Sequence, residues 1–114
     1  MKDWGAVVAA GLAFSGVELG TTYGKPALKV RGKMIAATTA PDPGSFVLHA
    51  SVDEKAILIE TDPVTFWEAD HYRGWPAVLV RYGTPATDRI ERLLARAWWD
   101  RSSVAERARY GARP

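Results

Sequence analysis

Residues 21–39 read "TTYGKPALKVRGKMIAATT", and this stretch decides the fold. From Pro26 to Arg31, apolar residues alternate with others, which is the period of a half-buried β-strand. A tight turn at Gly32-Lys33 leads into a second apolar run, so the stretch predicts an antiparallel hairpin. One face of the first strand is apolar and the other is largely basic: Leu28 and Val30 lie on the apolar face, and Ala27, Lys29 and Arg31 on the other.

A second segment echoes this one: residues 74–81 read "GWPAVLVR", and residues 24–31 read "GKPALKVR". The two share Gly, Pro, Ala, Val and Arg at the same offsets. A Gly-x-Pro turn before apolar alternation is a common way to enter a strand. The echo therefore indicates similar local structure rather than a repeated function.

The N-terminal segment predicts a helix packed on the core, because its apolar residues recur with helical spacing and Asp3 can be the N-cap. The same uncharged run imitates the apolar part of a secretory signal, but it is too short to span a bilayer. Asp3 also spoils the basic segment that such a signal needs. The core helix is preferred, with this stripe: Trp4, Val7, Val8, Gly11 and Leu12.

The rest of the chain alternates between strand and helix patterns. Ser51 and Glu54 form a capping box that opens a short helix, and Thr84-Pro85 or Thr87 caps a final one. Further strands are expected at residues 17–22, 46–50, 65–69 and 76–82. The final helix has a clear apolar stripe: Ile90, Leu93, Leu94, Ala97 and Trp98. Strands in mid-chain with helices at both ends predict an α+β fold, an antiparallel β-sheet with the N- and C-terminal helices packed on one face.

Length and composition predict a small globular protein. The 114 residues are 47% hydrophobic and 25% charged, with a net charge of +2, which suits one folded domain over residues 1–100. Residues 101–114 are expected to form a basic tail or a short helix. The absence of cysteine excludes disulfides and thiolate metal sites and fits a cytoplasmic location. No membrane association is expected.

Basic and aromatic side chains cluster in and beside the two echoing segments. Basic residues on a sheet face would meet backbone phosphates, with counterion release supplying affinity. The candidates for nucleic-acid contacts are Lys25, Lys29, Arg31, Lys33, Arg73 and Arg81. The candidates for stacking or for ligand contacts are Tyr23, His71, Tyr72 and Trp75. The alternative is that the charges only solvate the outer face of the sheet while the aromatic rings fill the core near turns.

The motifs of catalysis and metal binding are missing from the sequence. His49 and His71 are the only histidines, and neither has a second ligand at a diagnostic spacing. His71 with Glu68 or Asp70 would make an acid-base pair, but no nucleophile motif and no phosphate loop accompanies it. We therefore expect no metal, no cofactor and no enzymatic activity.

Two long runs resemble the MmcQ/YjbR family of small bacterial proteins: "YGKPALKVRGKMIA" and, after "VDEKAILIETDP", "TFWEADHYRGWPAVLVRYG". The resemblance covers roughly residues 4–99. It implies a frataxin-like α+β sandwich and a DNA-binding role through two β wings. The iron binding of frataxin depends on an acidic first helix, and because the first helix here has almost no carboxylates, iron is not expected.

Three functional hypotheses follow from these residues. The first is DNA binding through the basic sheet, which predicts that the basic residues lie together on one face and that binding weakens steeply with salt. The second is a protein-interaction or small-ligand module, which predicts an apolar groove around Tyr23, Tyr72 and Trp75. The third is a hydrolase-like enzyme that uses His71 and a carboxylate in a cleft. The charge placement and the resemblance favour the first.

Overall fold

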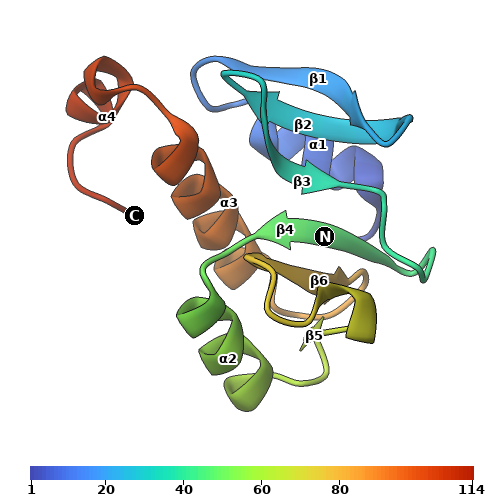
Figure 1. Cartoon of the computed structure of the whole chain (residues 1–114). Coiled ribbons are helices and arrows are strands. Elements are labelled where there is room, and N and C mark those ends of the chain that lie inside the picture. Colours follow the sequence, from blue (N-terminus) through green and yellow to red (C-terminus); the bar gives the residue numbers. More distant parts are fainter.

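The protein is built on one six-stranded antiparallel sheet. The computed structural model describes all 114 residues. The strand order is β1-β2-β3-β4-β6-β5 (Figure 1), and every neighbouring pair is antiparallel. The strands are β1 (Val17–Thr22), β2 (Lys25–Val30), β3 (Lys33–Ala37), β4 (Ser45–His49), β5 (Phe66–Trp67) and β6 (Ala77–Arg81).

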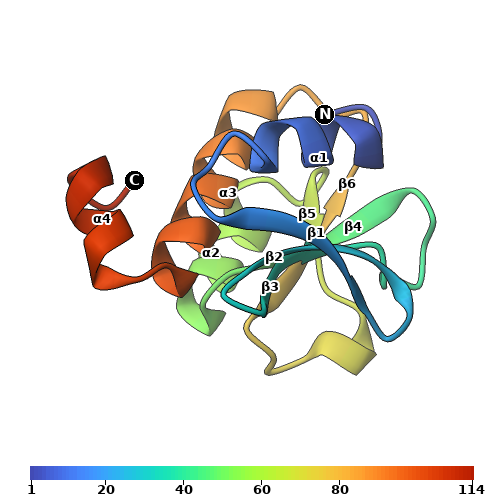
Figure 2. The ribbon, with the colours of Figure 1, turned by 90° about the horizontal axis from the view of Figure 1, so that it is seen from above.

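The helices are α1 (Trp4–Gly11), α2 (Val52–Thr61), α3 (Thr87–Arg101) and α4 (Val104–Tyr110), with a short 3-10 helix, η1 (Asp70–Tyr72). Figure 2 shows α1 and α3 on one side of the sheet and the segment that contains η1 on the other. This arrangement confirms the predicted α+β fold. No helix combines the length and the apolar character that a membrane span requires.

The main core lies between the sheet and the two helices. The predicted stripe of α3 is buried throughout. Trp98 is only 2% exposed, its ring stacks on Phe14 at 5.4 Å, and its indole nitrogen donates to the carbonyl oxygen of Ser15 at 2.7 Å. Because the indole N–H has an acceptor, the largest core side chain is buried without an unsatisfied polar group.

Three of the helix starts use side-chain caps. The side chains of Asp3, Ser51 and Ser103 accept hydrogen bonds from the backbone three residues further on. These bonds confirm the predicted N-caps at Asp3 and Ser51, but the Glu54 carboxylate pairs with Arg96 at 3.2 Å and does not complete the predicted capping box. They also show that the C-terminal segment forms α4, the helical one of the two predicted alternatives.

The predicted cap of α3 is wrong, because the N-cap is Ala86 and no side chain caps the helix. Both candidate threonines have other partners. The hydroxyl of Thr84 accepts from the hydroxyl of Thr65 at 2.8 Å, and Thr87, the first helical residue, accepts from the backbone nitrogen of Met1 at 3.0 Å. Tertiary contacts have replaced local capping here.

Two other local predictions need correction. The β2–β3 turn is at Arg31-Gly32, one residue before the predicted position, so Arg31 has left the strand. The strand predicted at 65–69 is only two residues long, since the chain turns away from the sheet into η1.

His49, at the end of β4, links the sheet to the end of α3. Its Nδ1 atom lies 3.2 Å from Nη2 of Arg101. Burial, followed by the charge of Arg101, lowers the pKa of His49 from its ordinary value of 6.5. The folded protein therefore holds this imidazole in its neutral form.

We predict that His49 makes the protein less stable in mild acid. The unfolded chain binds a proton below about pH 6.5, but the folded chain resists it, so the stabilisation is complete above that pH and is lost as the pH falls through the lowered pKa. Urea denaturation between pH 5 and 8 should give a shallower acid-side decline for His49→Gln than for the unmutated protein. Equal slopes would contradict the assignment.

Candidate functional site

The face of the sheet away from α1 and α3 carries a second, smaller apolar cluster. Its buried members are mostly small: Ala27, Ala37, Val47, Ala77 and Leu79. Partly buried side chains, among them Met34, Trp67 and Tyr72, pack against this cluster. Small side chains make a shallow floor, so the depth of any groove on this face depends on what stands around it.

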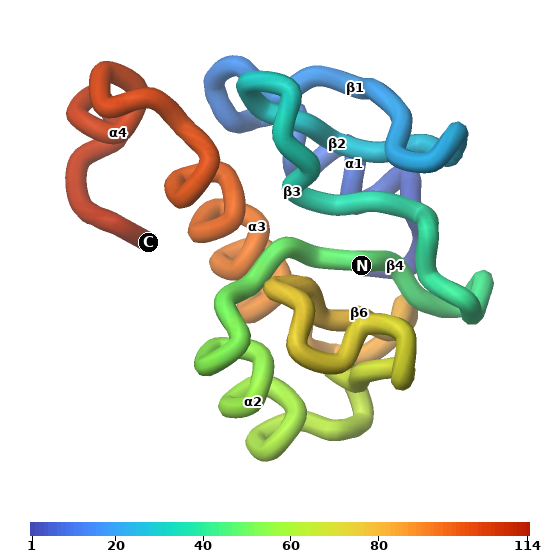
Figure 3. The backbone as a smooth tube through the Cα atoms, in the orientation of Figure 1, coloured from blue at the N-terminus to red at the C-terminus, as the bar shows by residue number.

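A cavity of about 330 Å³ opens on this floor. Met34, Val47 and Ala77 form its base, and it lies between the β1–β2 turn and the segment that follows β5. Figure 3 shows that segment, in yellow, crossing in front of β6. The volume is at the lower end of the range for small-molecule sites. The cavity lining includes all four predicted aromatic and imidazole residues, Tyr23, His71, Tyr72 and Trp75, together with Thr22, Lys25, Thr39 and Pro41.

Tyr23 forms one wall from a strained turn. It has φ +51° and Gly24 has φ +75°, so both residues of the two-residue β1–β2 turn have a left-handed backbone conformation. Asn, Asp or Gly is preferred at such a position, whereas a bulky residue pays a conformational cost. The Tyr23 side chain is 88% exposed, so packing does not offset this cost.

The opposite wall is formed by residues 71–75. The Tyr72 hydroxyl donates to the carbonyl oxygen of Thr39 at 3.1 Å, and the His71 ring meets the Tyr72 ring edge-on at 5.4 Å. Trp75 is 54% exposed at the rim. Thus one aromatic residue of this wall is anchored and another is free to contact a ligand.

A buried lysine of α2 holds this wall in place. The Lys55 side chain is 4% exposed, and its ammonium contacts Glu68 Oε2 at 2.6 Å. The ammonium also donates to the carbonyl oxygens of Tyr72 at 3.0 Å and of Trp75 at 2.7 Å. An ammonium has three protons, and each has an acceptor here. Lys55 therefore ties both ends of the 68–75 segment to one helix.

Sequence reasoning missed Lys55. A lysine on a short helix is ordinarily read as a solvated residue. The available signal was its spacing from Leu58, because residues three apart share a helix face and Leu58 is the other buried residue of α2.

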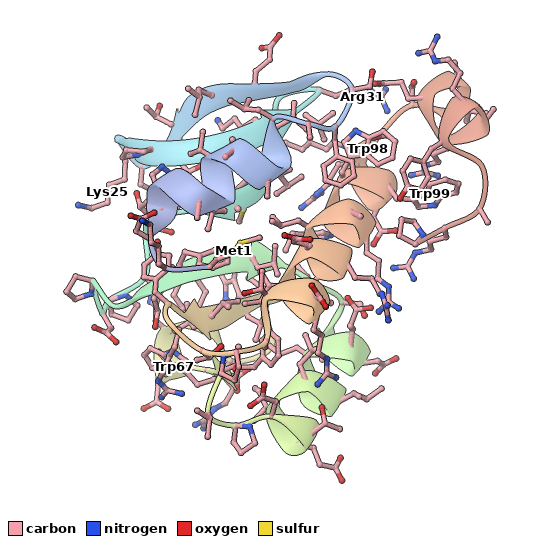
Figure 4. The ribbon with its side chains drawn as sticks, turned by 180° about the vertical axis from the view of Figure 1, so that it is seen from behind. Met1, Lys25, Arg31, Trp67, Trp98 and Trp99 are labelled. Atoms are coloured by element: carbon pink, nitrogen blue, oxygen red, sulfur yellow. The ribbon has the colours of Figure 1, made fainter.

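The predicted basic residues do not form one continuous stripe. Lys25 lines the groove, and Lys29 lies opposite Met34 across the β2–β3 pair. Arg31 and Lys33 flank Gly32 at the β2–β3 turn, at the end of β2 opposite to Lys25. Figure 4 shows Lys25 and Arg31 pointing away from opposite ends of the sheet.

The two remaining basic residues contact other parts of the protein. Arg73 pairs with Asp70 at 2.7 Å on the surface. Arg81 donates to the carbonyl oxygens of Pro63 at 3.0 Å and Val64 at 3.2 Å, and its guanidinium lies 5.1 Å from the centre of the Trp67 ring. Arg81 therefore fastens the β5 edge of the sheet.

His71 forms no ion pair with a carboxylate. Glu68 bonds to Lys55 and Asp70 to Arg73, so the two acids of the predicted acid-base pair have other partners. No group of three or more His, Asp or Glu side chains is arranged to hold a metal ion. The arrangement of the groove suits non-covalent binding of an apolar, flat group.

We predict that Lys55→Met loosens the groove wall. It leaves Glu68 and two carbonyl groups without their donor, and we expect a loss of about 2–4 kcal/mol in the free energy of unfolding. Trypsin should cleave after Arg73 faster in this variant, relative to cleavage after Arg31 in the same chain. Lys33→Met, at an exposed site, is the control and should behave like the unmutated protein. Unchanged cleavage after Arg73 would show that the segment does not need Lys55.

Comparison with known proteins identifies the family. A search of curated proteins and a search of solved structures found no match. The family model described as YjbR matches residues 12–99, which include the whole sheet, the groove and most of α3. The chain therefore belongs to the YjbR family.

Proposed function

We propose that this protein is a binding module that takes a small, flat aromatic ligand into the groove on the open face of the sheet. One observation carries the proposal: side chains from two segments about fifty residues apart converge on one apolar cavity. Aromatic walls above an apolar base favour a planar ring, which can stack on the walls and remove apolar area from water. The proposal assigns no catalytic step.

The conformation of Tyr23 supports this proposal. An exposed aromatic residue at positive φ costs stability and gains nothing from packing in the free protein. Asn at this position would make the protein more stable than Tyr does. A residue that is kept at a cost in stability is expected at a site that contacts another molecule. The β2–β3 turn has the same geometry, with Arg31 at φ +54° and Gly32 at φ +76°, and it lies away from the groove. Because the same conformation occurs at Arg31 without an adjoining groove, the strain supports the proposal only together with the position of Tyr23 at the cavity.

We predict that Tyr23→Asn moves stability and binding in opposite directions. The free energy of unfolding should rise by about 0.5–1 kcal/mol, because Asn tolerates the left-handed conformation. Affinity for N-phenyl-1-naphthylamine, a neutral probe with a naphthalene and a phenyl group that is followed by its fluorescence, should fall about threefold to tenfold. Arg31→Asn should give the same gain in stability with unchanged probe affinity. Equal probe affinity in all three proteins would reject the groove as the binding site.

A second candidate function is DNA binding through the β2–β3 hairpin. The chain has no carboxylate between Glu18 and Asp42, although this stretch includes Lys25, Lys29, Arg31 and Lys33. Such a segment is attracted to phosphates over its whole length. The resemblance to proteins with two β wings points the same way. DNA binding ranks second because the basic residues lie at both ends of the β2–β3 hairpin and do not form one continuous surface.

We predict that, if the hairpin contacts phosphates, Lys29→Glu/Arg31→Glu abolishes binding to a labelled duplex in fluorescence anisotropy. Each lost phosphate contact lowers the slope of log affinity against log salt by about one. Arg92→Glu/Arg109→Glu changes the charge equally at exposed sites of α3 and α4 and should retain binding. No binding at low salt, or an equal loss in both variants, would reject this function.

A further inference from the structure

We propose that the ligand of the groove is an aromatic acid, a flat ring system that carries a carboxylate or a phosphate; this inference rests on the proposed groove function. The groove contributes apolar and aromatic surface for the ring. Two lysines beside it provide the charge that selects the acid: Lys25 and Lys29.

Lys25 begins β2 immediately after the Tyr23-Gly24 turn, and it is part of the groove lining. It is exposed and forms no ion pair within the protein. In Figure 4 its side chain extends past the end of the hairpin, into solvent. A cation in this position can meet a charged group at the mouth of the groove without being buried.

Lys29 is in β2, and its side chain extends toward β1 on the same face of the sheet as Lys25. Its cross-strand partner is Glu18, yet a Cβ atom placed on Gly20 would lie 3.3 Å from Lys29 Cδ and 3.8 Å from its Cε. Gly20 is two residues nearer than Glu18 to the β1–β2 turn, so the lysine stem leans toward the end of the sheet that carries Tyr23. Because Gly20 has no side chain, the Lys29 side chain has room to follow this path. Lys29 is not itself part of the groove lining, but its β3 partner, Met34, is.

No carboxylate opposes these cations in the groove. Its lining contains no Asp or Glu. The nearest acid of the opposite wall, Asp70, is paired with Arg73. Lys25 is the only Lys, Arg, Asp or Glu among the lining residues, so an anionic ligand is attracted to the mouth. The apolar base disfavours a buried charge, so the ring occupies the base and the acidic group stays at the mouth.

Two fluorescent probes that differ by one acidic group test this inference. One is 8-anilinonaphthalene-1-sulfonate, and the other is N-phenyl-1-naphthylamine, which lacks only the sulfonate. The unmutated protein should bind the sulfonate about threefold to tenfold more tightly, the range expected for one or two exposed ion pairs. Lys25→Gln/Lys29→Gln should remove this preference, because it lowers the affinity for the sulfonate more than the affinity for the neutral probe. Arg31→Gln/Lys33→Gln removes the same charge from the other end of the hairpin and should keep the preference.

Displacement of the bound sulfonate by 1-naphthoate would support a carboxylate ligand, and displacement by 1-naphthyl phosphate a phosphate. Displacement by neither would overturn the inference. Equal affinity of the unmutated protein for both fluorescent probes, or an equal loss of preference in the two double variants, would also overturn it while leaving the aromatic groove intact. If Trp75→Ala changes the affinity for neither probe, the proposed groove function itself fails. Circular dichroism melts of all variants check that each is folded.

Discussion

Two helices can cover only one face of this sheet, and the rest of the structure follows from that constraint. Burial of one face against α1 and α3 contributes most of the hydrophobic stabilisation. The opposite face must then be closed by other means or be made tolerant of water. The protein uses small side chains over much of this face and lays the segment between β5 and β6 across one part of it. The groove lies in the part left uncovered.

The covering segment is not stabilised by a large core of its own, and a buried charge holds it instead. Lys55 reaches from α2 to Glu68 and to the carbonyl groups of Tyr72 and Trp75. Removing an ammonium from water is costly, and the cost is offset only when all three of its protons have acceptors. Those acceptors are available in one conformation of the segment. The buried charge therefore selects the conformation that forms the groove wall, and the site depends on an interaction outside the cavity.

The two hairpin turns both hold a bulky residue in a costly backbone conformation. Tyr23 and Arg31 both occupy left-handed positions that Asn or Gly would fill at lower cost. Tyr23 stands at the groove, and Arg31 at the opposite end of the hairpin sheet. The cation nearest the groove follows the first turn directly, so one turn supplies both an aromatic wall and a charged mouth. This pairing of ring and charge is what the proposed aromatic acid would recognise.

The sequence by itself determined the α+β fold, the covered face, the Asp3 and Ser51 caps and the aromatic candidates, because alternation, helical spacing and capping are local properties. It did not determine the start of α3, where Thr84 and Thr87 bond to distant residues. A shift of one residue in a turn removed Arg31 from the face on which it was predicted. Only the tertiary structure brought Tyr23 to Tyr72 and Trp75, separated Lys25 from Arg31, and revealed Lys55 as the buried tether. These facts depend on strand register and on the path of a non-local segment, and no local pattern encodes either.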